Sequence, residues 1–308
     1  MNWRKLGLVY APTNLGNWAV QTATLPTPIR HSSGAIRVFV SFCDAQGVGR
    51  PGYVDVDPHE PTRVLKVSRE PLIDIGAPGT FDDNGAVVCS VVDVGEGTYY
   101  MYYVGFEQCL KVRYRLFTGL AISTDGGDTF IKYKTTPILD RSPRELYFRC
   151  GPYVRLDEGT FRMWYIAGSE WTLVDGKDVP VYTLKYIESK DGLNWGDEGV
   201  SSMDISNPDE HGFGRPWVMR RADGLHELFY SIRRRSVGAY RLGYAQSSDG
   251  LNWKRNDALL GLDVTPGSFD SDAIEYSAVI EVDGRTYCFY NGNAFGRDGF
   301  AVAELVHQ

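Results

Sequence analysis

The chain has 308 residues, of which 43% are hydrophobic and 13% aromatic, with 34 glycines and 15 prolines. Such a composition favours short strands joined by tight turns. The 32 basic and 39 acidic residues give a formal net charge of −7, which argues against a general nucleic-acid binder, because such a protein presents a basic face. The run Arg233–Arg235 is the local exception, and we interpret it as a solvated loop.

The cysteines and the N-terminal segment bear on the compartment. No C-x-x-C pair occurs, which favours neither a disulfide framework nor a zinc site. The start, MNWRKLGLVYAPTN, lacks the apolar run of a signal peptide, and no apolar stretch of about 18 residues follows. We therefore predict a cytoplasmic protein without membrane or nucleic-acid partners. The five widely spaced cysteines are Cys43, Cys89, Cys109, Cys150 and Cys288.

In chain order, the sequence predicts strands in groups of four. The first group, within residues 12–70, reads TLPTPIRHS, AIRVFVSFC, GYVDVD and TRVLKVS. The second, within 75–140, reads GAVVCSVVDV, TYYMYYVGF, RLFTGLAIS and TFIKYKTTPIL. The third and fourth, within 145–202 and 210–262, repeat that order. The fifth, within 270–308, reads YSAVIEVDG, RTYCFYNGN and GFAVAELV, and lacks a fourth strand.

A phrase that begins Ser-x-Asp-Gly and ends on an aromatic residue marks the period of these groups. It starts at Ser123, Ser189 and Ser247, so the spacings are 66 and 58 residues. Repeats of this length with strand-like content predict the four-stranded blades of a propeller. The lettering is similar to a sialidase-type Asp-box. Because Asp-Gly suits a tight turn between a third and a fourth strand, we interpret the phrase as structural.

The N-terminal segment WRKLGLVYAP resembles the strand that the fifth group lacks. Trp3 corresponds to the aromatic residue that ends each repeated phrase. We predict that residues 3–10 complete the last blade and close the ring, which leaves no exposed sheet edge. The alternative, an N-terminal tail, is disfavoured because the segment is apolar and alternating. The predicted fold is thus a single all-β domain, residues 1–308, forming a five-bladed β-propeller.

Propellers bind ligands over the central channel, beside loops that enter the innermost strands and loops that join second to third strands. Several charged residues fall in the entering loops. Charges clustered near the axis need either partners of opposite charge or a function in binding or catalysis. Carboxylates, guanidiniums and aromatic rings together suit a sugar. The charged residues of the entering loops are Asp82, Asp83, Arg149, His211, Arg215, Asp270, Asp272 and Glu275.

The phrases GTFDDNGAV, GLAISTDG, FRCGPYV and FYNGNAFG give the chain a likeness to a known group. It resembles the five-bladed propeller glycosidase superfamily of arabinanases, β-xylosidases, invertases, levansucrases and mannoside phosphorylases. The resemblance implies three carboxylates at the innermost-strand starts of the first three blades, two of which act across the scissile bond. Asp82 or Asp83 matches the second. No acid precedes Asp44 in the first blade, and Arg149 stands where the third acid belongs. The usual hydrolytic triad is therefore not carried over.

Our first hypothesis is a carbohydrate-active enzyme, a hydrolase, phosphorylase or transferase, that cleaves or transfers a glycosidic linkage. We expect Asp83 to be catalytic, with Glu170 and Glu275 as acid/base partners. Arg149 and Arg215 either bind an anionic sugar, a sugar phosphate or phosphate, or they neutralise Asp83 and Glu275.

Further residues are expected to contact the sugar, and Tyr276 and Phe295 offer additional stacking faces. The missing acids motivate a second hypothesis, a non-catalytic propeller that binds a glycan or a sugar phosphate. A sugar transferase of surface polysaccharide synthesis is a third. No cofactor is expected, although Asp and Asn oxygens leave a structural calcium in the channel open. The predicted sugar contacts are Asp82, Asp44, Arg149, Arg215, His211, Trp171, Asp272 and Asn293.

Overall fold

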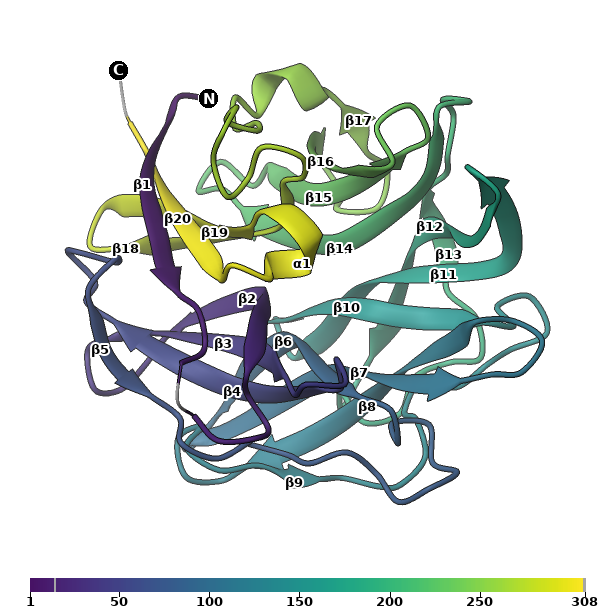
Figure 1. The fold of residues 1–308 in the computed structure, drawn as a ribbon, viewed down its shortest axis with the longest axis horizontal. Coiled ribbons are helices and arrows are strands. Elements are labelled where there is room, and N and C mark those ends of the chain that lie inside the picture. The colour runs from purple at the N-terminus through teal and green to yellow at the C-terminus, as the bar shows by residue number, and fades with distance from the viewer. Residues whose placement is uncertain (14, 307–308) are drawn as a thin grey trace.

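The computed structural model describes residues 1–13 and 15–306, and within them the regular secondary structure is almost entirely β-strand (Figure 1). The first antiparallel sheet has the order β2-β3-β4-β5. Each strand pairs with the next one in sequence, so the connections are short hairpins. The strands are β2 (Gln21–Arg30), β3 (Ile36–Cys43), β4 (Gly49–Val56) and β5 (Val64–Val67).

Three further antiparallel meanders follow, joined into one 12-stranded sheet by short parallel pairings at Phe148↔Leu116 and Tyr182↔Gly212. The first contains β6 (Ala86–Gly95), β7 (Thr98–Gln108), β8 (Tyr114–Ser123) and β9 (Ile131–Lys132). The second contains β10 (Phe148–Asp157), β11 (Thr160–Val174), β12 (Lys177–Ser189) and β13 (Val200–Met203). The third contains β14 (Glu210–Arg220), β15 (His226–Arg234), β16 (Ala239–Ser247) and β17 (Lys254–Arg255), followed by the 3-10 turn η1 (Asp257–Leu259).

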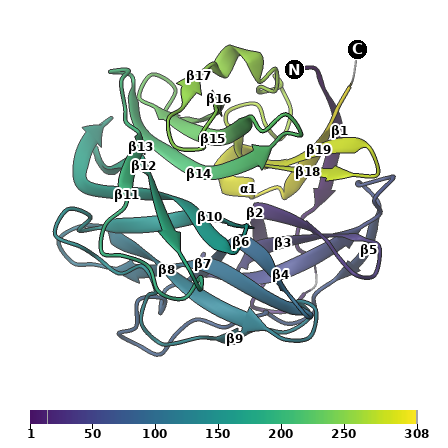
Figure 2. The same ribbon diagram turned by 180° about the vertical axis from the view of Figure 1, so that it is seen from behind.

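The last sheet combines both ends of the chain in the order β1-β20-β19-β18. β1 runs antiparallel to β20, with Trp3 opposite Leu305, and the two termini lie side by side when seen from behind (Figure 2). The N-terminal segment is therefore a paired strand and not a free tail. The elements are β1 (Trp3–Tyr10), β18 (Glu275–Val282), β19 (Arg285–Asn291), the short α1 (Asn293–Gly296) and β20 (Phe300–Leu305).

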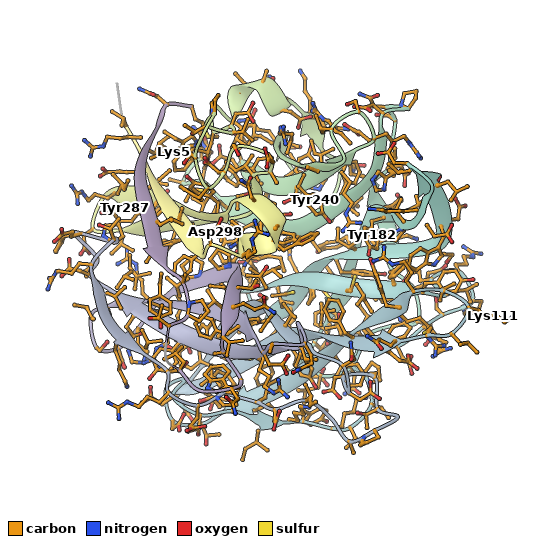
Figure 3. All side chains as sticks on the ribbon, viewed as in Figure 1. Lys5, Lys111, Tyr182, Tyr240, Tyr287 and Asp298 are labelled. Carbon is orange, nitrogen blue, oxygen red and sulfur yellow. The ribbon has the colours of Figure 1, made fainter. Side chains whose placement is uncertain are left out.

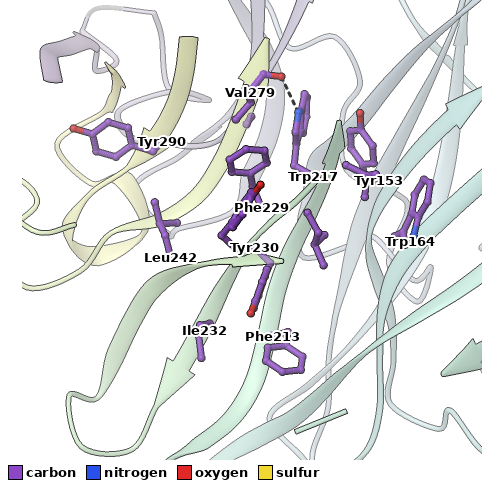
Figure 4. Close-up of a cluster of buried hydrophobic side chains, with 14 of the residues drawn as sticks. Tyr153, Trp164, Phe213, Trp217, Phe229, Tyr230, Ile232, Leu242, Val279 and Tyr290 are labelled. Atoms are coloured by element: carbon purple, nitrogen blue, oxygen red, sulfur yellow. Dashed lines mark hydrogen bonds between the residues drawn. The ribbon is translucent and has the colours of Figure 1, made fainter. Parts of the chain in front are cut away.

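Large aromatic side chains fill the space between neighbouring sheets (Figure 4). Trp217 on β14 is buried, and its indole Nε1 donates a 2.8 Å hydrogen bond to the Val279 carbonyl on β18. Tyr153 on β10 packs against the other side of Trp217, with ring centroids 4.7 Å apart. Burying one such side chain stabilises the fold by about 1.5–3 kcal/mol. These contacts hold the innermost strands β10, β14 and β18 in a fixed arrangement.

The innermost strands share an irregularity at equivalent positions. The pairing register shifts near Leu25 in β2, Gly151 in β10, Arg215 in β14 and Tyr276 in β18, and all four residues have positive φ. Non-glycine residues seldom adopt this conformation, which costs of order 1–3 kcal/mol unless the surroundings enforce it. The bulges turn the Arg215 side chain across the centre of the molecule, where it meets the other inner strands.

The repeated Ser-x-Asp-Gly phrase forms the turn between third and fourth strands, as predicted. Between β16 and β17, Ser247 Oγ donates to Asp249 Oδ1 at 2.7 Å, and the same oxygen accepts the backbone N–H groups of Leu251 and Asn252. Gly250 has the positive φ, 73°, that the turn requires. Hydrogen bonds from the backbone and side chain of Asn252 hold the pKa of Asp249 well below its usual range. These contacts all lie within the turn, so the Asp249 carboxylate stabilises the turn itself.

Candidate functional site

Asp82, in the loop before β6, is paired with a cation of its own sheet. Asp82 is 2% exposed, and its Oδ2 accepts hydrogen bonds from Lys132 Nζ at 2.6 Å and from the Tyr103 hydroxyl at 3.0 Å. Its Oδ1 accepts one from Thr80 Oγ1. A buried carboxylate satisfied in this way stabilises the sheet and has little freedom to meet a ligand. Asp82, a predicted sugar contact, is thus placed in a structural ion pair.

The same arrangement recurs in the other sheets. Before β10, the buried Glu145 pairs with Arg149 Nε at 2.6 Å and accepts a 2.9 Å hydrogen bond from the Tyr165 hydroxyl. Arg149 also donates to the carbonyls of Asp140 and Gly196. Arg149 therefore neutralises Glu145, and neither Asp83 nor Glu275 is its partner. Two more acid–base pairs of this kind are Glu210–Arg255 at 2.7 Å and Asp270–Lys5 at 2.5 Å.

Arg215 occupies the centre of the inner strands. It is 2% exposed, and its guanidinium donates to Pro26 O at 2.7 Å, Thr27 Oγ1 at 2.8 Å and Tyr276 O at 3.1 Å. A longer contact, 3.4 Å, reaches Cys89 O. Burial lowers the pKa of Arg215 to about 10. The side chain ties β14 to β2, β6 and β18, so most of its donors are already used.

Three other predicted sugar contacts stabilise loops. Asp44 caps the β3–β4 hairpin, accepting the N–H groups of Gln46 and Val48, and pairs with Arg50 at 3.1 Å. Asn293 Oδ1 accepts the backbone N–H of Asp272 at 2.8 Å, which fixes the loop before β18. These contacts account for Asp44, Asp272 and Asn293 without a ligand.

Asp83, Glu170 and Glu275, the predicted catalytic acids, lie in different surroundings. Glu170 is exposed on β11, and Asp83 is half-buried, with Oδ2 accepting the Gly79 N–H at 2.8 Å. Glu275 is buried at the start of β18. Among residues 1–13 and 15–306, no hydrogen bond or ion pair joins any two of them.

Glu275 belongs to a set of residues that we call the tyrosine–arginine cluster. They come from β8, β12, β15, β16 and β18, and all but the β12 residue lie at or near an end of their strand. Tyr182 and Tyr240, two members, lie near the middle of the view in Figure 3. The cluster consists of Tyr114, Tyr182, Arg233, Tyr240, Glu275 and Tyr276.

Arg233 is the only cation in the cluster. Its guanidinium carbon lies 4.8 Å from the Tyr240 ring centroid and 5.4 Å from that of Tyr182. Arg233 forms no ion pair within the described part of the chain, and the Tyr240 hydroxyl beside it can accept a hydrogen bond from its guanidinium. The interpretation of Arg233–Arg235 as a solvated loop is wrong, because Arg233 and Arg234 belong to β15 and Arg233 is half-buried. The strand alternation in HELFYSIRR, which puts Phe229, Ser231 and Arg233 on one face, is the signal that sequence reasoning missed.

Glu275 has an unusual environment for a carboxyl group. It is 1% exposed, Oε1 accepts the Phe295 N–H at 2.9 Å, and Oε2 has no partner in the described residues. Burial raises the pKa of Glu275 to about 8, against the opposing charge of Arg233. Burial therefore favours the protonated form of this carboxyl, the form that a general acid requires.

Aromatic rings continue from the cluster on both sides. Trp171 packs 5.4 Å from Tyr114, and its indole N–H has no partner in the described residues. Phe295, 50% exposed, is stacked at 6.5 Å on Tyr276. His211 lies buried beside the Pro180 carbonyl, and burial lowers its pKa. The predicted residues Trp171, Glu275 and Tyr276 are thus brought to one region.

Across residues 1–13 and 15–306, no three or more His, Cys, Asp or Glu side chains gather in a way that could hold a metal ion. None of the helices in the same residues has the length and apolar character needed to cross a membrane.

The chain matches no protein-family model. By fold, it is similar to a "Glycoside hydrolase" (TM-score 0.74, 21% identity, 99% of this chain and 92% of that one) and to a "thermostable family-43 glycoside hydrolase" (TM-score 0.69, 17%, 96% and 93%). The resemblance to propeller glycosidases is thereby confirmed at the level of fold. In sequence, it is 35% identical over 306 residues to "Uncharacterized protein Rv1502" of Mycobacterium tuberculosis (strain ATCC 25618 / H37Rv), covering 99% of each chain. The chain belongs to the same protein family as Rv1502, with the fold of the β-propeller glycoside hydrolases.

Proposed function

We propose that the chain is a carbohydrate-active enzyme that binds a sugar at the tyrosine–arginine cluster and cleaves or transfers a glycosidic linkage there. The observation that carries the proposal is Glu275, a buried carboxyl with one free oxygen and a pKa raised to about 8. A group that is protonated at neutral pH can donate its proton to a leaving glycosidic oxygen. The neighbouring rings of Tyr276, Phe295 and Trp171 offer apolar faces for a sugar.

The five antiparallel strand sets are the blades of one propeller domain over residues 1–308, and the pairing of β1 with β20 closes its ring. The cluster then stands over the central channel. Asp83, half-buried and without an ion pair among the described residues, is the carboxylate that would act as base or nucleophile opposite Glu275.

A second candidate function is sugar binding without turnover. Asp82 and Glu210, two of the acids nearest the inner strands, are held in ion pairs with Lys132 and Arg255. A site that has lost its second carboxylate retains binding and loses chemistry.

The experiment is a screen of aryl glycosides and oligosaccharides with the purified protein, with and without inorganic phosphate. We expect turnover that falls at least about 100-fold in Glu275→Gln and Asp83→Asn, because acid–base groups contribute about 10²–10⁴ in rate. Asp249→Ala, which alters a distant turn, serves as the matched control and should keep the rate. Phosphate-dependent turnover would identify phosphorolysis. Binding without product would select the second function, and full activity in Glu275→Gln would refute its assigned role.

A further inference from the structure

We propose that the sugar bound at the tyrosine–arginine cluster is acidic and that Arg233 receives its carboxylate. The inference rests on the proposed function, because it concerns the substrate class of the same site. The observation behind it is that Arg233, the cation of the cluster, forms no ion pair with the Glu275 carboxyl or with any other acid of the described residues. Desolvated charges in proteins are normally paired, so a half-buried guanidinium without an anionic partner points to a ligand that supplies one.

Four other arginines have strong ion-pair or hydrogen-bond partners. Arg37 pairs with Asp55 at 2.8 Å, Arg149 with Glu145 at 2.6 Å and Arg255 with Glu210 at 2.7 Å. Arg215 uses three strong acceptors, two carbonyls and a hydroxyl, in place of a carboxylate. Among the described residues, neither Arg233 nor its half-buried neighbour Arg234 forms an ion pair. Arg233 differs from Arg234 in lying between the rings of Tyr182 and Tyr240, beside the buried carboxyl of Glu275.

The geometry around Arg233 suits a carboxylate. The Tyr182 and Tyr240 rings contact the guanidinium at 5.4 Å and 4.8 Å, and aromatic rings interact with the face of such a group. The N–H groups at its edge then remain as donors, and a guanidinium edge binds a planar carboxylate through two parallel hydrogen bonds. The hydroxyls of Tyr114 and Tyr182, 3.4 Å apart, are further donors beside it.

The charge balance favours a carboxylate over a phosphate. Arg233 contributes one positive charge, and burial shifts both Glu275 and His211 toward their neutral forms by raising the pKa of the first and lowering that of the second. Arg113 lies 5.7 Å over the Tyr114 ring but is exposed and donates to the Asp178 carbonyl at 3.4 Å, and Arg235 donates to the Leu173 carbonyl at 3.2 Å. One formal positive charge balances one carboxylate, whereas a phosphomonoester carries about two negative charges near neutral pH.

The test is isothermal titration of the whole chain with glucuronate, galacturonate and mannuronate. Each acid is compared with its methyl ester, with the neutral hexose and with the hexose 6-phosphate. We expect at least one acid to bind roughly ten- to hundredfold more tightly than its ester, the range of a hydrogen bond to a charged group. An equal affinity for acid and ester would overturn the proposal, and a preference for the 6-phosphate would overturn the choice of a carboxylate.

Variants assign the effect to Arg233. Arg233→Met, which keeps the length and removes the charge, should abolish the preference for the acid over its methyl ester. Arg233→Lys keeps the charge without the planar edge and should recover only part of the preference. Arg234→Met, on the opposite face of β15, is the control and should bind as the wild type does. Retention of the preference in Arg233→Met overturns the assignment. If the wild-type chain binds no sugar at all, both the proposed function and this inference are wrong. If it binds neutral and acidic sugars equally well, only this inference is wrong.

Discussion

Arg215 Nη1 donates a 2.7 Å hydrogen bond to the carbonyl of Pro26, 189 residues away in the chain. The guanidinium thereby joins the innermost strand of the β14–β17 sheet to that of the first sheet. It also reaches the Tyr276 carbonyl at 3.1 Å on β18. A single buried side chain connects three sheets that have no β-ladder between them.

Replacing Arg215 with Met should therefore lower the free energy of unfolding by roughly 3 kcal/mol or more, because each buried acceptor that loses its donor costs about 1–3 kcal/mol. Urea denaturation measures the change as a lower midpoint at constant slope. Arg215→Lys keeps the charge and should restore a part of the loss. A change below about 0.5 kcal/mol in Arg215→Met would contradict the role.

Removal of residues 1–10 should abolish cooperative unfolding, because β20 would lose its only partner on that side and expose an edge. Circular dichroism on heating distinguishes a single transition from a broad one. A truncated chain that melts as the full chain does would contradict this prediction.

Point variants of β1 distinguish the stability that comes from the strand from the stability that comes from the Lys5–Asp270 ion pair. Lys5→Met leaves the fully buried Asp270 without its cation and should cost about 2 kcal/mol or more. Arg4→Met removes a cation whose side chain is 63% exposed, and the stability should stay within about 0.5 kcal/mol. Equal losses of stability in the two variants would mean that the Lys5–Asp270 ion pair stabilises the fold no more than the exposed Arg4–Glu304 pair does.

The Glu275 carboxyl predicts a pH dependence of stability. Its pKa rises from an ordinary 4.5 to about 8 on folding, so between these values the folded chain binds more protons than the unfolded one. Stability then falls as the pH rises through this window, at up to about 1.4 kcal/mol per pH unit. Glu275→Gln should remove this part of the decline when unfolding is measured between pH 5 and about 8. An unchanged slope in the variant would place the pKa of Glu275 near its usual value.

Asp249→Ala should destabilise the chain by about 1–2 kcal/mol, since two backbone N–H groups and the Ser247 hydroxyl lose their acceptor. Sugar binding at the tyrosine–arginine cluster should be unaffected, because the turn joins β16 to β17. Thermal unfolding and sugar titration measure the two effects separately. Lost binding with intact stability would assign the turn a functional role.

The sequence predicted the order of the strands, their grouping and the position of the Ser-x-Asp-Gly turns, and it identified residues 3–10 as a strand. These features are encoded by neighbouring residues. Alternation over a few positions defines a strand, and an Asp-Gly pair satisfies its own turn. Trp3 also matches the aromatic residues that end the repeated phrases. This local similarity assigned the N-terminal strand to the last group of strands.

The pairing of charges was decided only by the tertiary structure. Asp82 and Asp83 are adjacent and chemically identical, yet Lys132, 50 residues away, reaches only Asp82. Arg149, placed by sequence beside the site, is paired with Glu145, whereas Arg233, interpreted as solvated, lies between two tyrosine rings. The free energy of a buried charge depends on the partners that other strands bring within a few ångströms. Local sequence patterns define the strands, but the contacts between distant strands decide which charged residues are left for a ligand.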